Sequence, residues 1–192
     1  PAGGAFVTAG AYKTAAGVTA GVAFSLTASG FRLDTTTPAF SGLGAYVLDD
    51  GVGTNRFPPA NGAALGGLQL TSAEVTRILA EAIKIANRAR AQIRTPLNSP
   101  VQVTISVVDT SANILGVIRT PDAPVFGTDV AVQKARGALL FSKTTAAATL
   151  NGLAPAGVLG YTPNIPSYVT AMQGLIGGAL TNGVAYSQRA VG

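Results

Sequence analysis

The segment from Leu70 to Pro96 carries the pattern that most limits the fold of this 192-residue chain. It opens with Thr71-Ser-Ala-Glu74, where the Thr71 hydroxyl can accept a hydrogen bond from the Glu74 N–H while Glu74 reaches back, which is a capping box. Apolar residues then recur at helical spacing, at positions 75, 78, 79, 82, 86, 89 and 93. Pro96 ends the pattern. A helix with one apolar face must bury that face, so we expect it to pack on a sheet.

The residues that follow predict an antiparallel hairpin. Residues 101–109 alternate between apolar and other side chains, which is typical of a strand with one buried face, and residues 113–119 form a second apolar strand. A short polar turn joins them, and we expect Asn113 or its neighbour to adopt a positive φ. Further helices are predicted over 128–144 and 164–178, and a strand is predicted to start near residue 183.

Four polar residues stand near this hairpin in a chain with only 11% charged residues: Asp109, Arg119, Asp122 and Lys134. Lys134 lies on the small, alanine-lined side of its predicted helix, where a buried ammonium group needs an anion. One of the two aspartates, or a carboxylate on a ligand or neighbouring subunit, could supply it; a buried stem with its amine in water is the other reading. Aspartate is also common at turns for local hydrogen bonding. The sequence therefore leaves open whether the four residues bind a ligand or fix the fold.

The stretch from Leu70 to about Thr149 resembles the GlcG/HbpS-like family, which also includes the C-terminal domain of PduO-type proteins. Three ordered motifs carry the resemblance: the capped helix "LTSAEVTRILAEAIKIANRARAQ", the hairpin "VTISVVDTSANILGVIRTPDAP" and the helix "DVAVQKARGALLFS". Ala112 stands where the family usually has a turn glycine.

The resemblance implies an α+β fold of the profilin-like type, a mostly antiparallel sheet with packed helices. It divides the chain into a Gly/Ala/Thr-rich extension over residues 1–64, with one or two strands, and the family domain over 65–192. It also implies a homo-oligomer or a subunit of a larger assembly, and binding of haem, a corrinoid or a small anionic ligand near Arg119, Asp122, Lys134 and Asp109. A fragment of a larger secreted member, partnered by other domains or chains of the same precursor, would fit the extension.

The composition excludes several function classes. The chain has no His and no Cys, so it contains neither a zinc site of the usual ligands nor a Ser-His-Asp triad. Haem ligation is left to Met172 and five tyrosines at positions 12, 46, 161, 168 and 186. Asp109 and Asp122 could act as an acid–base pair, but their turn positions favour a local role. We expect no catalytic residue and no metal site.

A second function remains in view, that of a structural or assembly subunit of an extracellular or cell-surface complex. The low charge and the many Ala, Gly and Thr residues suit a surface buried against neighbours. The net charge of +5 lies mainly in one predicted helix, which favours a solvated face over a nucleic-acid site. No membrane span is visible, and we expect an extracellular or periplasmic location.

Overall fold

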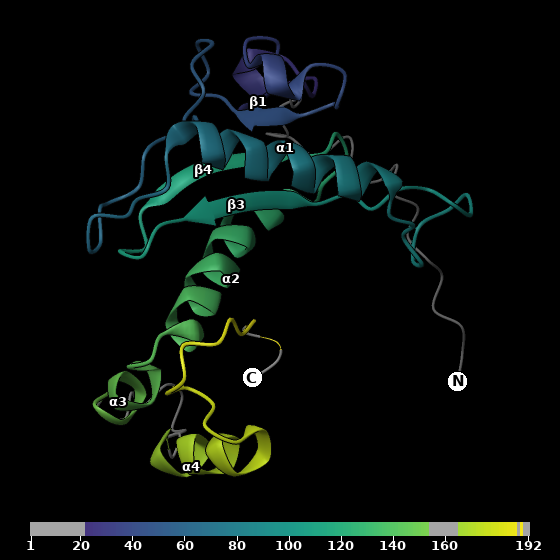
Figure 1. Cartoon of the computed structure of the whole chain (residues 1–192). Coiled ribbons are helices and arrows are strands. Elements are labelled where there is room, and N and C mark those ends of the chain that lie inside the picture. Colours follow the sequence, from purple (N-terminus) through teal and green to yellow (C-terminus); the bar gives the residue numbers. More distant parts are fainter. Residues whose placement is uncertain (1–21, 154–164, 188, 190–192) are drawn as a thin grey trace, which may run out of the picture.

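A four-stranded antiparallel sheet lies at the centre of the computed structural model, which describes residues 22–153, 165–187 and 189. The strand order is β1-β2-β4-β3. The strands are β1 (Phe31–Leu33), β2 (Tyr46–Leu48), β3 (Thr104–Val108) and β4 (Ile114–Arg119). The helix α1 (Ser72–Arg88) lies along one face of the sheet, and α2 (Gly127–Ser142) packs against β3 from the other side (Figure 1). The expected α+β class with a mostly antiparallel sheet is confirmed.

The helix α1 begins as the sequence predicts and ends earlier. Thr71 is its N-cap, and both hydrogen bonds of the capping box are formed. The buried side chains of α1 are Val75, Leu79, Ala80, Ile83 and Ala86. Ile78 and Ile93, which the spacing places on the buried face, are 43% and 97% exposed. The helix stops at Arg88 because the chain folds back on itself, so Ile93 belongs to a loop rather than to the helix.

The predicted hairpin is present as β3 and β4. Ile105 pairs with Ile118, and Val107 pairs with Gly116. These positions face α1, where Ile105 and Val107 pack against a core cluster that includes Val75 and Leu79. Ala112, the neighbour of Asn113, takes the positive φ, at 67°. The turn therefore keeps the shape that usually favours glycine, although the residue is alanine.

Part of the N-terminal segment joins this sheet. β1 and β2 pair with each other, and β2 pairs with β4. Two short 3-10 turns, η2 (Thr27–Ser29) and η3 (Pro38–Phe40), flank β1, and Phe40 and Val47 are fully buried in the same core as α1. The division at residue 64 into an extension and a domain stays a prediction, and residues 1–21 lie outside the described part of the chain.

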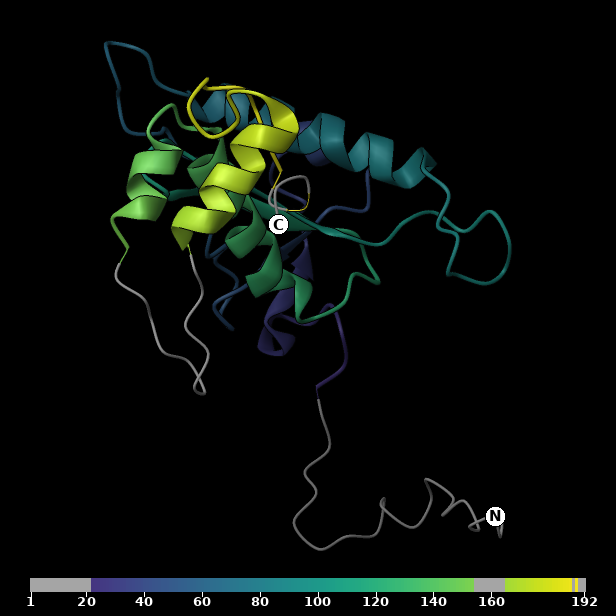
Figure 2. The same ribbon diagram turned by 90° about the horizontal axis from the view of Figure 1, so that it is seen from below.

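The C-terminal part forms a second, smaller cluster at the far end of α2. The helices α3 (Ala146–Asn151) and α4 (Ile165–Ile176) pack against each other there (Figure 2). The predicted helices over 128–144 and 164–178 are α2 and α4, whereas α3 is not among the predicted elements. The strand expected near residue 183 is not formed by residues 183–187, because side chains of Ser142 and Asn182 bind the backbone N–H groups of Tyr186 and Val184.

The contact between α1 and β4 depends on Gly116. A Cβ atom there would lie 2.8 Å from Leu79 Cδ1 and 3.3 Å from Val75 Cγ1. We expect Gly116→Ala to lower the free energy of unfolding by about 1–3 kcal/mol, because an added methyl overpacks this contact. Gly174→Ala in α4, where no atom lies within 4 Å of the added Cβ, should instead be neutral or raise stability by up to about 1 kcal/mol. Denaturant unfolding of both variants checks this, and equal effects would contradict the packing argument.

Candidate ligand-binding groove

The strand β3 presents two chemically different faces. Ile105 and Val107 pack toward α1, so Thr104 and Ser106 point toward α2. The helix α2 meets this polar face with a stripe of small residues, Ala131, Ala135 and Ala138. At the start of α2, a Cβ on Gly127 would lie 3.2 Å from Thr104 Oγ1. The small residues therefore allow the helix to lie close to the strand.

A pocket of about 680 Å³ opens beside this contact, and we call it the basic pocket. Its walls come from three segments: β3, α2 and the C-terminal residues Ser187 and Arg189. Ile105 also lines it, although the Ile105 side chain packs toward α1. The basic pocket therefore reaches the free edge of β3, which pairs on its other side with β4.

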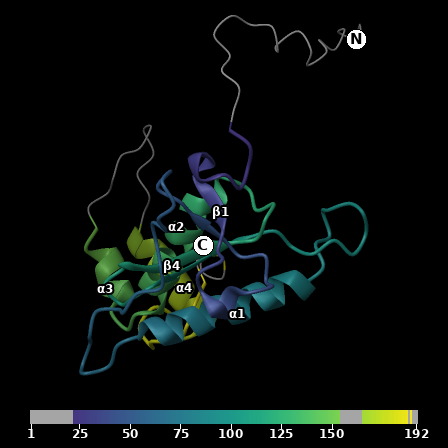
Figure 3. The ribbon, with the colours of Figure 1, turned by 90° about the horizontal axis from the view of Figure 1, so that it is seen from above.

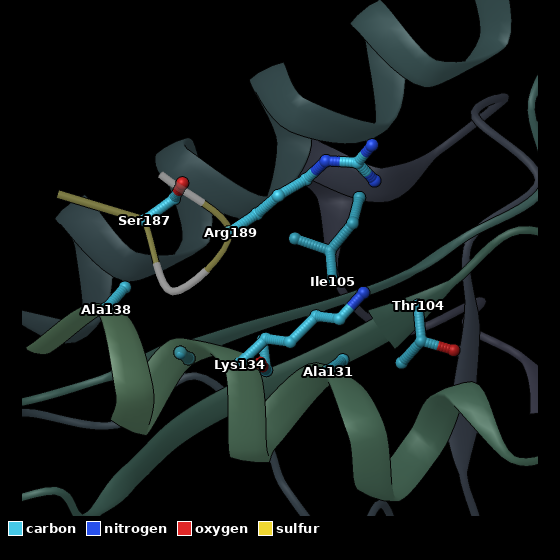
Figure 4. Close-up of a pocket in the computed structure, with 9 residues that line it drawn as sticks. Thr104, Ile105, Ala131, Lys134, Ala138, Ser187 and Arg189 are labelled. Carbon is cyan, nitrogen blue, oxygen red and sulfur yellow. The ribbon is translucent and has the colours of Figure 1, made fainter. Parts of the chain in front are cut away.

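Two cationic side chains line the basic pocket. Figure 4 shows Lys134 from α2 and Arg189 from the C-terminal segment extending toward the same end, near Thr104 and Ile105. None of the described residues that line the pocket is acidic. Lys134 is exposed and forms no ion pair with any described carboxylate. Lys134 faces the alanine side, as the helix pattern predicts. Of the readings that the sequence leaves open, a pair with Asp109 or Asp122 is not formed, whereas a stem along the pocket with the amine in solvent is.

Two hydroxyl groups beside the pocket have unmet hydrogen-bonding capacity. Thr104 Oγ1 and Ser106 Oγ are shielded from solvent, and neither has a hydrogen-bond partner in the described part of the chain. A buried polar group without a partner costs about 1–3 kcal/mol. An apolar side chain at either position would avoid that cost, so the two hydroxyls do not themselves stabilise the contact between β3 and α2.

The basic pocket continues along α2 as a longer groove. The next stretch is lined by Val108, Leu139 and Tyr186 and shares Ala135, Ala138 and Ser187 with the basic pocket. A further stretch reaches Lys143 and Gly183. The C-terminal segment is held beside α2 because the Tyr186 N–H donates to Ser142 Oγ at 2.9 Å. The groove is thus mostly apolar in its middle, with Lys134 and Arg189 at one end and Lys143 at the other.

Asp109 is the hydrogen-bond centre of the hairpin turn. Its carboxylate accepts from the backbone N–H groups of Ser111 and Asn113, both at 2.9 Å, and from Asn113 Nδ2 at 3.0 Å. It also accepts from the N–H of Ala63 at 2.8 Å, which ties the preceding loop to the hairpin. Burial alone would raise the pKa of Asp109, but the hydrogen bonds from Ala63, Asn113 and Ser111 outweigh it and lower the pKa to about 2.

Asp122 and Arg119 are engaged elsewhere. Asp122 Oδ2 lies 2.5 Å from Arg94 Nη1. Arg119 is 1% exposed, donates to the carbonyl of Ala123, and holds its guanidinium carbon 4.2 Å from the ring centroid of Phe31. Its Nε and Nη1 have no hydrogen-bond partner in the described residues, and the aromatic ring takes their place. Burial lowers the pKa of Arg119, and the charge of Asp122 partly opposes this shift.

The four predicted site residues do not converge on one pocket. Lys134 lines the basic pocket, whereas Asp109 lines a mostly apolar pocket that shares Val108 and Leu139 with the middle stretch of the groove. Neither Arg119 nor Asp122 lines either of these two pockets. Sequence reasoning missed Thr104 and Ser106, although the strand pattern places them opposite Ile105 and Val107. It also missed Arg189, for which the local sequence gives no signal.

The described residues offer little for metal binding. They contain no group of three or more acidic, histidine or cysteine side chains placed to hold a metal ion. Among the described residues that line the basic pocket, none is of a type that usually ligates haem iron, and Tyr186 lines the adjoining stretch of the groove. Met172 and Tyr168 pack in the cluster of α3 and α4 instead. Within the same residues, no helix combines the length and apolar character needed to cross a membrane.

Comparison with known proteins identifies the family to which this chain belongs. A family model described as haem degrading protein HbpS-like matches residues 78–182, which is more than half of the chain. The matched residues include most of α1, the β3–β4 hairpin, α2, and α4. The chain therefore belongs to the HbpS-like family, as the three sequence motifs indicated. No curated protein and no solved structure matches it.

The hydrogen bonds of Asp109 predict acid sensitivity. The folded-state pKa of about 2 lies below the ordinary value of 3.8, so the carboxylate contributes stability above about pH 4 that is lost as the pH falls toward 2. At pH 7, Asp109→Asn should lower the free energy of unfolding by about 2 kcal/mol, because charge-assisted hydrogen bonds are replaced.

Urea unfolding between pH 7 and pH 2 checks this prediction. The difference between wild type and Asp109→Asn should shrink through the lower half of that range. Asp129→Asn, an exposed aspartate in the first turn of α2, serves as the control and should change stability by less than about 1 kcal/mol. A difference at Asp109 that does not depend on pH would contradict the assignment.

Proposed function

We propose that this domain is a non-catalytic, haem-related accessory domain that binds an apolar ligand carrying carboxylates in the basic pocket. Haem, or a related tetrapyrrole such as a corrinoid, is the ligand class we favour, and the family description of haem-degrading proteins points the same way. The observation that carries the proposal is the lining of the pocket: Lys134 and Arg189 stand beside an alanine wall with no acidic side chain.

The chemistry of the pocket supports such a ligand in two ways. The stripe of Ala131, Ala135 and Ala138 offers a flat apolar wall, and burial of apolar surface supplies most of the affinity of small ligands. Lys134 has no carboxylate partner within the described residues. A ligand carboxylate can therefore pair with Lys134 without first breaking an ion pair inside the protein. Each contact of this kind in a partly exposed site is worth about 1 kcal/mol.

Haem fits this site through its ring and propionates rather than through its iron. Lys134 and Arg189 would hold the propionates, and the alanine wall would cover one face of the ring. Because no side chain of a usual haem-ligand type lines the basic pocket, the protein would orient the ligand and partly exclude water from it. Iron bound in this way would supply any redox chemistry. We assign no catalytic residue to this chain.

The ligand test compares haemin with metal-free protoporphyrin IX. Both should bind with similar affinity, because the carboxylates and the ring carry the interaction. Lys134→Gln should weaken binding of both by about fivefold, the effect of losing one exposed ion pair. Thr104→Val, which removes an unpartnered hydroxyl, should raise the free energy of unfolding by about 1 kcal/mol. Quenching of the protein's tyrosine fluorescence and the Soret absorption of the bound porphyrin measure binding.

The matched control is Lys84→Gln, which removes a lysine from α1, on the opposite side of the sheet. It should leave binding of both ligands unchanged. Binding of haemin alone, with no binding of the metal-free porphyrin, would show that iron ligation carries the interaction and would refute the proposed mode. Equal loss in the Lys134 and Lys84 variants would point to a general charge effect and not to this pocket.

We also propose that the protein works as an oligomer outside the cytoplasm, possible partners being copies of the same chain. The free edge of β3 and the exposed side chains of Val125 (66%) and Phe126 (71%) support association. The low share of charged residues suits a surface buried against neighbours and is our ground for the extracellular or periplasmic location. The alternative of a structural assembly subunit rests on the same features.

The oligomer proposal predicts the mass in solution. Light scattering after size-exclusion chromatography at micromolar concentration should give at least twice the chain mass of 19.1 kDa. Phe126→Asp should shift the equilibrium toward monomer, because it places a charge in an apolar contact. A monodisperse monomer of the wild-type chain would rule the proposal out.

A further inference from the structure

Residues 89–100, the first part of the connection from α1 to β3, form a loop that projects from the end of α1 in all three ribbon views (Figures 1, 2 and 3). We call it the α1–β3 loop. It carries Ile93, which is 97% exposed, and Leu97, which is 71% exposed. Single exposed aliphatic residues are ordinary on protein surfaces. Here two of them lie on one projecting loop, and one is almost completely exposed. The loop therefore presents apolar surface that another molecule or surface can contact before it contacts the rest of the protein.

The shape of the loop is fixed at its base. The Val101 N–H donates to the carbonyl of Ala89 at 2.9 Å, and the Ala91 N–H donates to the carbonyl of Ser99 at 2.9 Å. Arg94 is tied to the body of the protein through Asp122, with Nη1 2.5 Å from Oδ2 and Nη2 3.1 Å from the Asp122 carbonyl. The hydrogen bonds at its base and the Arg94–Asp122 pair therefore fix the loop in the conformation that exposes Ile93 and Leu97.

The charged residues of the loop itself are all basic, and the one carboxylate paired with them is Asp122. Residues 88–100 contain three arginines and no acidic residue. Arg94 is paired with Asp122, whereas Arg88 and Arg90 are exposed and form no ion pair with any carboxylate in the described residues. Two arginines without an ion pair in the described residues thus lie at the base of the loop that carries the two exposed aliphatic side chains.

We propose that the α1–β3 loop docks on an anionic lipid surface, with Ile93 and Leu97 entering the interface and Arg88 and Arg90 contacting lipid phosphates and carboxylates. Basic residues beside an apolar tip are the combination that peripheral binding to anionic lipid requires. The loop has no aromatic side chain on which a base could stack, so it lacks the usual means of gripping single-stranded nucleic acid. The site lies apart from the basic pocket and does not rest on the proposed function.

The test uses the full chain and vesicles of phosphatidylcholine, with or without phosphatidylserine. The protein should sediment with the mixed vesicles and not with the neutral ones, and added salt should release it. Ile93→Ser combined with Leu97→Ser should weaken binding by at least about tenfold, because both apolar contacts are lost. Arg88→Gln and Arg90→Gln should each weaken it by about fivefold. All four side chains are exposed, so the fold should not change.

Two matched controls change similar residues elsewhere. Leu175→Ser on α4, where Leu175 is 80% exposed, and Lys143→Gln should leave vesicle binding unchanged. Because the chain has no tryptophan, Ile93→Trp also supplies a reporter whose emission should shift to shorter wavelength on mixed vesicles, whereas Leu175→Trp should show no shift.

Equal binding to neutral and mixed vesicles, or undiminished binding of the double serine variant, would overturn the proposal. So would an emission shift of the Ile93→Trp variant that follows protein concentration without lipid, because the loop would then be a contact between copies of the chain.

Discussion

The strand β3 is the element on which the rest of the structure depends, because its two faces must satisfy two different helices. Ile105 and Val107 turn toward α1 and complete the apolar core, whereas Thr104 and Ser106 turn toward α2. A face with hydroxyl groups cannot be covered by large apolar side chains at no cost, and α2 covers it with glycine and alanine. Small residues leave space beside the contact, and the basic pocket occupies that space.

The elements with strong local signals were predictable from the sequence. The capping box fixed the start of α1 at Thr71, and alternation fixed the β3–β4 hairpin and its turn. The end of α1 was not predictable from periodicity, because apolar residues continue at helical spacing through Ala89 and Ile93. Backbone hydrogen bonds that turn the chain back decide that boundary, and they involve Ser99 and Val101, which lie beyond the pattern. Likewise, α3 depends on packing against α4 rather than on a pattern of its own.

The candidate site shows why a cluster of polar residues in sequence need not be a cluster in space. Asp109 and Asp122 are each occupied by other groups of the protein: Asp109 by the turn amides and the Ala63 N–H, and Asp122 by Arg94. Arg119 is buried against Phe31, a residue 88 positions earlier that no local pattern connects with it. Of the four residues, only Lys134 lines the basic pocket. Its neighbours on α2 are alanines, which are too small to cover the lysine side chain. The hydroxyl groups of β3 could not be singled out from the sequence, because only the structure shows that α2 shields them.

The Arg94–Asp122 ion pair is one link between the α1–β3 loop and the basic pocket, besides the chain itself, which runs from the loop into β3. Asp122 pairs with Arg94 in the loop, and five residues later the chain enters α2. The Asp122 side chain is 80% exposed in this pair, and exposed ion pairs contribute about 1 kcal/mol at most. A coupling free energy of that size changes affinity by no more than about fivefold. Through this ion pair, occupancy of one site should therefore bias the other only weakly.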